Sequence, residues 1–354
     1  MDISFILPVY NGESYIEKSI GSILKWNREP KIEILVIDDG STDETLNFCK
    51  KIAETDRRVH LFSIENSGQS IARNYGMKQC FGRYIYFVDA DDRVDVDEIY
   101  HMWVVAEQEN VDVIMGGYFR VNGDHSERIS LPGEGFMARV GTSEEQALYH
   151  KVKAESAFGY LWNKLYKKEF LDKNNLQMDD IRKVYMEDQL FNLKVWSKNP
   201  SWYCCDKPVY YYEVGNVSTT RRAEPQIHMK NLVMIDALIA YYSEYQILEE
   251  NLDVLIPLIM RTFCWSLVKN IEYEAKSTAK MRERAKAYMD SPNVQKAIKI
   301  RGAVKMLWKL PSFLQAVFYS VCMVLIRWKW SGFVAGLFYM TYPIMKKYIF
   351  RVLK

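Results

Sequence analysis

The chain has 354 residues, 49% of them hydrophobic and 26% charged, a composition that excludes disordered and fibrous classes and is long enough for two domains. Its net charge of +2 conceals an asymmetry, because no acidic residue follows Asp290 whereas eleven lysines and arginines lie between Lys296 and Lys354. Six cysteines without CxxC or zinc spacing, and a start without an apolar signal segment, predict a cytoplasmic protein with reduced thiols.

Short apolar segments alternate with amphipathic segments along the first 120 residues. Strands are expected at 3–7, 32–37, 59–64, 84–88 and 111–115. Helices are expected from about 13, at 69–79 and at 95–109, with another after the second strand that has Glu44 in its first turn. Ser41 or Thr42 is the expected N-cap of the second helix. This alternation predicts an α/β fold, with a parallel sheet covered by helices on both faces.

Polar residues gather where each expected strand ends. They are found at 8–11, 38–39, 65–66 and 89–92. The carboxyl ends of parallel strands share one edge of a sheet, where open α/β sheets bind their ligands. A nucleotide and a metal ion are the expected ligands. The sequence contains no GxxxxGK[ST] motif and no GxGxxG after the first strand, which excludes a P-loop and argues against NAD.

Three carboxylates follow the apolar run Tyr84–Val88, namely Asp89, Asp91 and Asp92. Such a cluster is repulsive unless a cation lies among the acids. If the chain stays extended, Asp89 and Asp91 point the same way and suit Mg²⁺ or Mn²⁺. The alternative is a solvated acidic turn that caps a helix beginning near Val94.

Four motifs occur in order, PVYNGESYIEKSI, VIDDGSTDET, ENSGQSIARNYGM and YIYFVDADD. In this order and spacing the chain resembles family-2 glycosyltransferases of the GT-A fold, closely over residues 1–120 and more loosely to about 220. The resemblance implies a Rossmann-like, mostly parallel sheet. It also implies an inverting, metal-dependent transferase that uses a nucleotide sugar, with UDP the expected nucleotide.

The resemblance also assigns roles to single residues. Pro8 and Tyr10 flank the base-binding loop, Asp39 contacts the uracil or ribose, Arg73 reaches the nucleotide, Asp89 and Asp91 hold Mn²⁺ or Mg²⁺, and Asp92 lies beside them on the sugar side. A turn acid remains the alternative for Asp39, and a surface ion pair the alternative for Arg73.

The acceptor half is indicated by the segments 162–166 and 185–191, which resemble the W-x-K-L-Y and E-D-x-x-F motifs of the same family. By this resemblance Asp188 is the general base and Glu187 its neighbour, although both could be ordinary first-turn acids. A hairpin is expected around Asn122-Gly123, a loop at 133–141 and a helix from Thr142. Where many relatives carry Arg and some carry His after the last strand, this chain has Glu213 and Gly215; His228, Arg221 or Arg222 could substitute.

The C-terminal third is expected to be helical. Residues 310–326 and 330–345 are uncharged apolar runs, slightly short of a membrane span, and lysines and arginines flank them. A helical hairpin in the interface of an anionic membrane is expected, with a buried helical pair as the alternative. Nucleic acid is excluded as a partner, because such an arm needs less apolar surface.

These features predict a catalytic domain at 1–220 (donor half 1–120, acceptor half 121–220), a helical extension at 221–300 and a membrane-associated tail at 301–354. The predicted function is transfer of one sugar from a nucleotide sugar to a saccharide acceptor that is lipid-linked, at the inner face of the cell membrane. A catalytically silent nucleotide-binding scaffold and a processive synthase are the alternatives. The absence of a QxxRW segment disfavours the synthase.

Overall fold

A computed structural model describes residues 1–131, 137–138, 159–214, 225–268, 277–310 and 312–348, with side chains through 342. The chain divides into two compact units, each described here by itself. The first unit contains Met1–Arg182 and Glu187–Ser218, and the second contains Lys183–Met186 and Thr219–Lys354. The expected loop at 133–141 and the expected helix from Thr142 lie largely outside the described residues.

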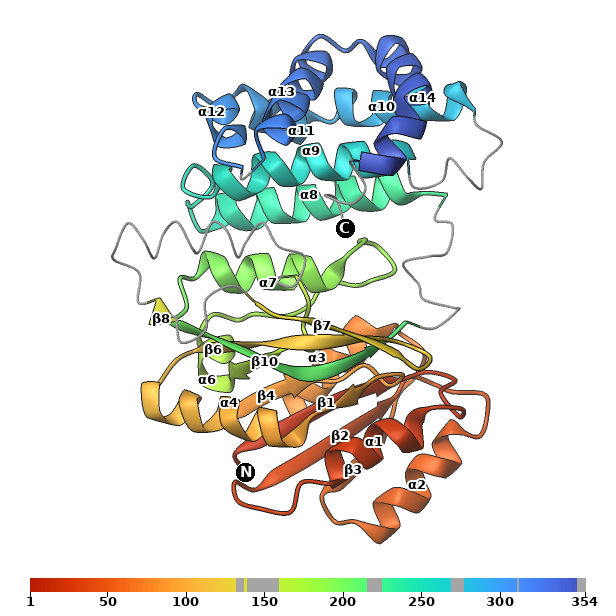
Figure 1. The fold of residues 1–354 in the computed structure, drawn as a ribbon, viewed down its shortest axis with the longest axis vertical. Helices are drawn as coiled ribbons and strands as arrows, with labels where there is room; N and C mark the ends of the chain where they lie inside the picture. Colours follow the sequence, from red (N-terminus) through yellow and green to blue (C-terminus); the bar gives the residue numbers. More distant parts are fainter. Residues whose placement is uncertain (132–136, 139–158, 215–224, 269–276, 311, 349–354) are drawn as a thin grey trace. The chain divides into compact units, whose positions relative to one another are not determined.

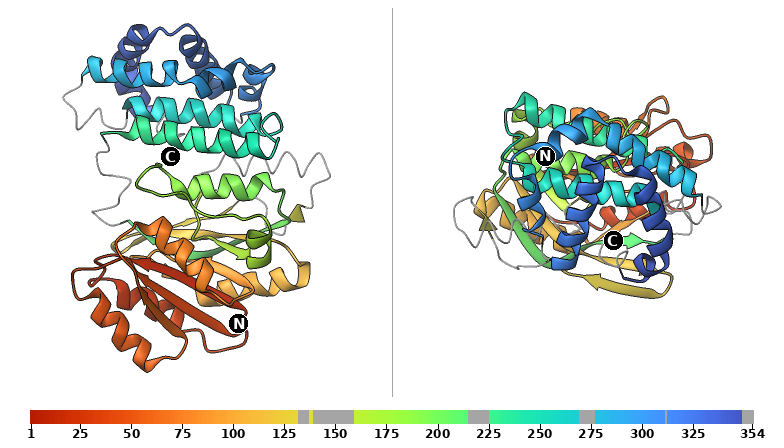
Figure 2. Two further views of the ribbon diagram at one scale, coloured as in Figure 1. Left: turned by 180° about the vertical axis from the view of Figure 1, so that it is seen from behind. Right: turned by 90° about the horizontal axis from the view of Figure 1, so that it is seen from above.

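The first four strands of the first unit are parallel. They are β1 (Ile3–Val9), β2 (Ile32–Asp38), β3 (Val59–Ser63) and β4 (Tyr84–Phe87), in the spatial order β3-β2-β1-β4. The helices between them are α1 (Ile16–Leu24), α2 (Thr45–Thr55) and α3 (Gln69–Gln79). The chain moves outward from β1 to β3 and then returns to β4, and right-handed crossovers therefore place α3 on the face opposite α1 and α2 (Figures 1 and 2). The order in which the chain adds strands to the sheet therefore reverses between β1 and β4, although these two strands are parallel.

Antiparallel strands complete the sheet. Strand β9 (Lys164–Lys167) lies antiparallel between β4 and β6 (Val113–Asn122), and β10 (Trp202–Glu213) is parallel to β6. The shorter strands are β5 (Arg93–Val94), β7 (His125–Ile129) and β8 (Met137–Ala138). The expected hairpin at Asn122-Gly123 is confirmed by the pairing of β6 with β7. The sheet is thus parallel from β3 to β4 and mixed beyond β4.

Hydrophobic periodicity explains the core of this unit. All seven residues of β1 and all seven of β2 are buried, as expected for strands covered on both faces. Helix α1 buries Ile16, Ile20 and Ile23, which recur at helical spacing. Gly82 is required between α3 and β4, because a Cβ there would lie 2.6 Å from the backbone nitrogen of Ser4.

Two local expectations are corrected. Neither Ser41 nor Thr42 caps α2; the helix begins at Thr45, whose backbone N–H donates to the Asp43 carboxylate at 3.1 Å. The chain also does not stay extended after β4: the Asp92 N–H donates to the Asp89 carbonyl at 3.1 Å and closes a turn. Helix α4 (Val96–Glu109) is capped by Asp95, which accepts from the N–H groups of Asp97 and Glu98. The cluster Asp89–Asp92 is therefore not a helix cap.

The remaining regular elements of the described residues are helices. The first unit adds α6 (Lys168–Lys173) and α7 (Glu187–Ser197). The second unit contains α8 (Ile227–Glu244), α9 (Leu252–Val268), α10 (Thr278–Asp290), α11 (Pro292–Lys299), α12 (Ala303–Leu307), α13 (Phe313–Arg327) and α14 (Ser331–Tyr348). Helix α9 packs against α8, α10, α11, α12, α13 and α14. Among the described residues, no helix is both long enough and apolar enough to cross a membrane.

Candidate active site

The reversal of strand order between β1 and β4 defines where a ligand crevice forms in such a sheet. Tyr10 follows β1 and is 49% exposed, and Asp89 follows β4. Pro8 lies inside β1, where it pairs with Ile37 of β2. The predicted site residues of the donor half therefore meet at this edge.

Asp39 follows β2 and is buried. Its two carboxylate oxygens accept backbone hydrogen bonds from Ser67 at 2.7 Å and Gly68 at 2.8 Å. Asp39 thereby holds the loop that leads into α3, which is the structural role of a turn acid. Each carboxylate oxygen has a second lone pair, so the predicted contact with the nucleotide stays a prediction.

The turn of Asp89, Asp91 and Asp92, called the acid turn below, is anchored by β10. The Asp89 N–H donates to the hydroxyl of Tyr210 at 3.0 Å, and the same hydroxyl hydrogen-bonds to the Asp92 side chain. The Asp92 carboxylate also accepts the backbone N–H of Glu213 at 2.7 Å. Asp92 is thus held inside the protein, whereas Asp91 reaches the surface.

The acid turn carries more negative charge than its surroundings balance. Burial among protein atoms, followed by the charge of Asp89, raises the pKa of Asp91 to about 6. Burial and the charges of Asp89 and Asp91 raise the pKa of Asp92 well above its usual range. A divalent cation would relieve this repulsion, and carboxylate oxygens are the ligands that Mg²⁺ and Mn²⁺ prefer.

The donor set therefore fits a hard cation with open coordination positions. Within the described residues no group of three or more His, Cys, Asp or Glu side chains is arranged as a metal cage. Asp89 and Asp91 would hold such an ion only together with oxygens of water and of a bound diphosphate.

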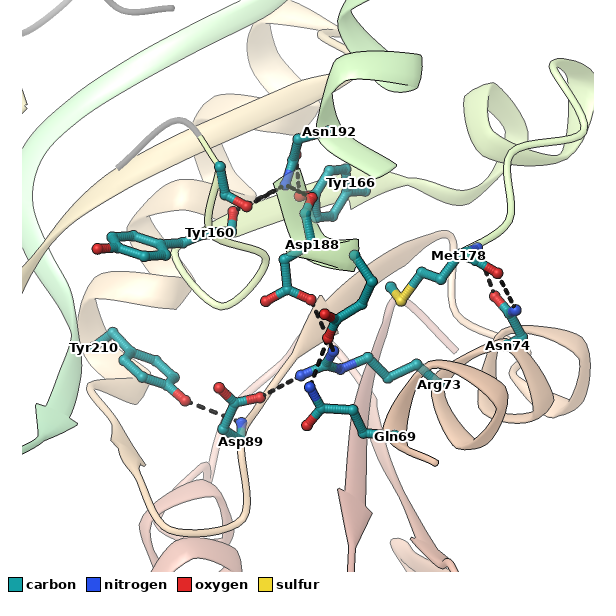
Figure 3. Close-up of polar contacts among 12 residues, drawn as sticks. Gln69, Arg73, Asn74, Asp89, Tyr160, Tyr166, Met178, Asp188, Asn192 and Tyr210 are labelled. Carbon is teal, nitrogen blue, oxygen red and sulfur yellow. Dashed lines mark hydrogen bonds and ion pairs between the residues drawn. The ribbon is translucent and has the colours of Figure 1, made fainter. Parts of the chain in front are cut away.

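Arg73 of α3 is buried beneath the acid turn, with 1% of its side chain exposed. One terminal nitrogen donates to Asp89 at 2.6 Å, and the other donates to Asp188 at 2.9 Å and Glu187 at 3.3 Å (Figure 3). This is not the surface ion pair that was the alternative. The predicted contact of Arg73 with the nucleotide stays a prediction, because both terminal nitrogens are engaged by carboxylates.

Glu187 and Asp188 open helix α7, as expected from the sequence. Glu187 accepts a hydrogen bond from the Gln69 side chain at 2.6 Å. Burial raises the pKa of the Asp188 carboxyl well above its usual value, with Glu187 and Asp89 adding to the rise and Arg73 opposing it. A carboxyl whose pKa is shifted toward neutrality is a stronger proton acceptor when it is ionised.

Several contributors to the site were not anticipated from the sequence. Asn192, one turn after Asp188, donates to the Asp188 carbonyl at 3.0 Å and accepts from the Tyr166 hydroxyl at 2.8 Å (Figure 3). Lys164 is fully buried in β9 and donates to Asn163 and to the Tyr160 carbonyl. Burial lowers the Lys164 pKa to about 7, against the opposing charge of Asp188.

A stack of aromatic rings braces Tyr210. The ring centroid of Trp162 lies 4.5 Å from that of Tyr160 and 4.5 Å from that of Tyr210. In each pair the rings are stacked, with an angle of 16° between their planes. The W-x-K-L-Y motif thus supports both halves of the site: Trp162 backs the residue that holds the acid turn, and Lys164 lies near Asp188. The motif itself was the only sequence signal for these roles.

The segment at the end of β10 differs from the pattern of many relatives in its charged residues. Glu213 stands where many relatives carry Arg, and its side chain pairs with Arg93 at 2.8 Å and Lys18 at 3.5 Å. Arg221 and Arg222 lie outside the described residues, and His228 is buried in α8. No replacement for the family's cationic contact is therefore assigned.

Comparison with known proteins agrees with this geometry. The model of the family "Glycosyl transferase family 2" matches residues 4–174. The glycosyltransferase EpsJ of Bacillus subtilis (strain 168), described as uncharacterized, is 32% identical over 275 residues, which cover 75% of this chain and 78% of EpsJ. The chain belongs to glycosyltransferase family 2.

Two further curated glycosyltransferases are also similar. GlyA of Streptococcus pneumoniae serotype 4 is 32% identical over 62% of this chain, which spans only 31% of GlyA. The poly(ribitol-phosphate) beta-N-acetylglucosaminyltransferase TarP of Staphylococcus aureus (strain N315) is 29% identical over 60% of this chain and 63% of TarP.

Solved structures confirm the GT-A fold. S. aureus TarS 1-349 in complex with UDP has a TM-score of 0.66 at 20% identity, covering 97% of this chain and 91% of that one. The same protein in complex with UDP-GlcNAc has a TM-score of 0.63 at 21% identity, covering 92% of each chain. The expected family and fold are thus confirmed, and the protein is a glycosyltransferase.

Proposed function

We propose that this family-2 glycosyltransferase transfers one sugar, with inversion, from a UDP-sugar to a hydroxyl of a lipid-linked saccharide during cell-surface polysaccharide synthesis. The observation that carries the proposal is the shared guanidinium of Arg73, which joins Asp89 of the acid turn to Asp188 of α7. A group suited to the leaving diphosphate and a group suited to the attacking hydroxyl are thereby held in one site.

The donor side of the proposal rests on the crevice at the β1–β4 reversal. Two TarS structures that share this fold were solved with UDP and with UDP-GlcNAc, which supports a uridine nucleotide as the carrier. Tyr10, at 49% exposure, is available to a base at the crevice, while Asp39 fixes the loop that borders it. Pro8 lies within β1, two residues before Tyr10.

Asp89 and Asp91 are the proposed ligands of Mn²⁺ or Mg²⁺. Asp92 is 2% exposed and accepts the Glu213 N–H, so it holds the acid turn from inside the protein and is not proposed to contact the sugar. When bound, the cation would stabilise the negative charge that develops on the diphosphate as the glycosidic bond breaks. Tyr210 keeps the acid turn in place through its hydrogen bonds to Asp89 and Asp92.

The acceptor hydroxyl would attack the anomeric carbon from the face opposite the diphosphate. Its proton passes to Asp188, its oxygen forms the new glycosidic bond, and the electron pair of the old bond leaves with the nucleoside diphosphate. Arg73 orients the Asp188 carboxylate, Asn192 holds the backbone carbonyl of Asp188, and Glu187 completes the ion-pair network beside it. The pKa of Asp188, raised by burial, suits it to accept this proton.

The proposed acceptor rests on a relative of this chain and on the sequence of its C-terminal segment. TarP is named for adding N-acetylglucosamine to poly(ribitol-phosphate), a polymer. A lipid-linked saccharide at the cytoplasmic face, with the enzyme peripheral to the membrane, agrees with the basic and apolar sequence of residues 301–354.

The test is a panel of nucleotide sugars, each incubated with the full chain and Mn²⁺ or Mg²⁺ while release of nucleoside diphosphate is measured. Release from one UDP-sugar, abolished by EDTA and restored by Mn²⁺, is the expected result. When a saccharide acceptor is included, NMR of the glycoside product reports the anomeric configuration, which should be opposite to that of the donor. Binding of nucleotide without turnover of any donor would favour the silent scaffold instead.

A further inference from the structure

Helix α13 exposes the kind of side chain that surface helices bury. Five apolar residues recur at helical spacing and are all exposed: Leu314 (79%), Val317 (37%), Val321 (47%), Val324 (45%) and Trp328 (62%). Between Phe313 and Ile326 the helix has no charged residue. An exposed helix face is normally polar, so this stripe, called the apolar stripe below, requires a partner.

The opposite face of α13 is already used. Ala316, Tyr319, Cys322 and Met323 are buried, and the helix packs against α9, α10 and α12. The apolar stripe is therefore a second apolar face of α13, distinct from the face that packs on the core. Both faces of α13 are apolar, and only one is covered within the described residues.

Aromatic side chains extend the stripe at its C-terminal end. Trp328 lies 5.3 Å from Trp330, and Trp330 lies 6.1 Å from Phe333 of α14, measured between ring centroids. All three are at least 49% exposed. Tryptophan is enriched where proteins meet the interface of a bilayer, because its ring is apolar and its N–H remains hydrated.

Charge identifies the partner. Arg301, Lys305 and Lys309 are exposed just before α13, and no acidic residue follows Asp290 in the sequence. Asp290, the last acidic residue in the sequence, already pairs with Lys329 at 2.9 Å. A twofold contact with a second copy would place these like charges beside their own counterparts, whereas anionic lipid headgroups complement them.

We infer that the apolar stripe, with its basic neighbours, is a docking surface for an anionic phospholipid membrane. The helix lies in the interface and does not cross it, since fifteen residues of α13 span about 22 Å and the hydrocarbon core is about 30 Å thick. The inference names the surface behind the proposed peripheral location and rests on the proposed function only for that purpose.

Vesicle flotation of the full chain tests the surface. Vesicles of phosphatidylcholine with phosphatidylglycerol should carry the protein upward, and vesicles of phosphatidylcholine alone should carry much less. The double variant Leu314→Glu/Val321→Glu should bind the anionic vesicles at least about tenfold more weakly. Two apolar side chains that would be buried in the bilayer are lost, and two negative charges are introduced. Lys305→Glu/Lys309→Glu should lose most of the preference for phosphatidylglycerol.

The control is Phe81→Glu, which introduces one negative charge, half that of the double variant, at an apolar residue of the first unit that is 80% exposed, as Leu314 is at 79%. It should float as the parent does, and all variants should melt as the parent does by circular dichroism. Flotation of the double variant at parental levels would overturn the inference, as would a parent that does not float. A parent that is a dimer in light scattering, made monomeric by Leu314→Glu, would assign the surface to a second copy.

The same samples separate this inference from the proposed function. Release of nucleoside diphosphate from a donor, without vesicles, should be unchanged in Leu314→Glu/Val321→Glu. A parent that floats but turns over no nucleotide sugar would contradict the proposed function and leave the docking surface standing.

Discussion

The guanidinium of Arg73 donates to the carboxylate of Asp188 across 2.9 Å, although 115 residues separate them in the sequence. Arg73 belongs to α3, in the first half of the sheet, and Asp188 to the first turn of α7. The same guanidinium also donates to Asp89 at 2.6 Å, so one cation is shared by the two halves of the site.

Replacing Arg73 with Lys tests this link. Lysine keeps the positive charge but lacks the planar fork, so it cannot hold Asp89 and Asp188 together. Transfer should fall by about a hundredfold, or ~3 kcal/mol at the barrier. Arg73→Met should in addition destabilise the protein by about 3 kcal/mol, because it leaves three acids without their cation. Steady-state kinetics and urea unfolding measure the two effects, and a fully active Arg73→Lys variant would contradict the role given to the fork.

Asp91→Asn tests the proposed metal ligand. Loss of one anionic ligand should reduce transfer by about a hundredfold or more and raise the Mn²⁺ concentration needed for half-maximal rate. The control is Asp95→Asn, since asparagine caps a helix about as well as aspartate; Asp95 caps α4 with one carboxylate oxygen and accepts from the Tyr211 hydroxyl at 3.3 Å with the other. Activity that survives both Asp91→Asn and EDTA would remove the metal from the account.

Tyr210→Phe tests how the acid turn is held. The substitution deletes the hydroxyl that accepts the Asp89 N–H and bonds Asp92, and should cost about 1–2 kcal/mol of the free energy of unfolding. Tyr86→Phe is the control, because the buried Tyr86 hydroxyl has no hydrogen-bond partner in the described structure. Equal losses in the two variants, measured by urea unfolding, would show that the hydroxyl of Tyr210 contributes nothing specific.

The buried Lys164 predicts a pH-dependent stability. Its pKa is lowered from 10.5 to about 7 in the folded protein. Between these values the unfolded chain binds the extra proton, so the free energy of unfolding should rise with pH, by up to ~1.4 kcal/mol per pH unit. Below pH 7 both states are protonated and the burial cost is present in full. Lys164→Met should abolish this slope.

The difference between the Lys164→Met variant and the parent, measured by urea unfolding at several pH values, cancels the tyrosines that titrate in both. A difference that does not change between pH 7 and 10 would show that Lys164 keeps its ordinary pKa.

The local pattern of apolar and polar residues was sufficient to predict most of the strands and helices in the first 120 residues. The alternation of buried strands and amphipathic helices fixes β1 to β4, and the acids at their ends could be assigned to one sheet edge by topology alone. The assumption that failed was local too: the alternation of side chains applies to an extended strand, and the chain turns at Asp89. A turn can also bring Asp89 and Asp91 to one cation, so the metal-binding role of this pair stays a prediction.

What the sequence could not provide is the pairing of distant residues. Nothing near Tyr210 indicates that it holds Asp89, 121 residues away, and nothing near Arg73 indicates that it faces carboxylates. Such contacts depend on how β9 and β10 extend the sheet, which is a tertiary property. The apolar stripe of α13 was visible as composition, but its exposure could only come from the packing of the opposite face on α9 and α10.

The most direct test of the account is Asp188→Asn. Asparagine preserves the shape of the side chain and removes the proton acceptor, with Asp172→Asn, an exposed acid paired to Lys168, as the control. Transfer should fall by about 10²- to 10⁴-fold while the Kd of the donor nucleotide, measured by calorimetry, stays within a few-fold of the parent. Loss of donor affinity in step with the rate, or a rate that does not change, would contradict the assignment of Asp188 as the general base.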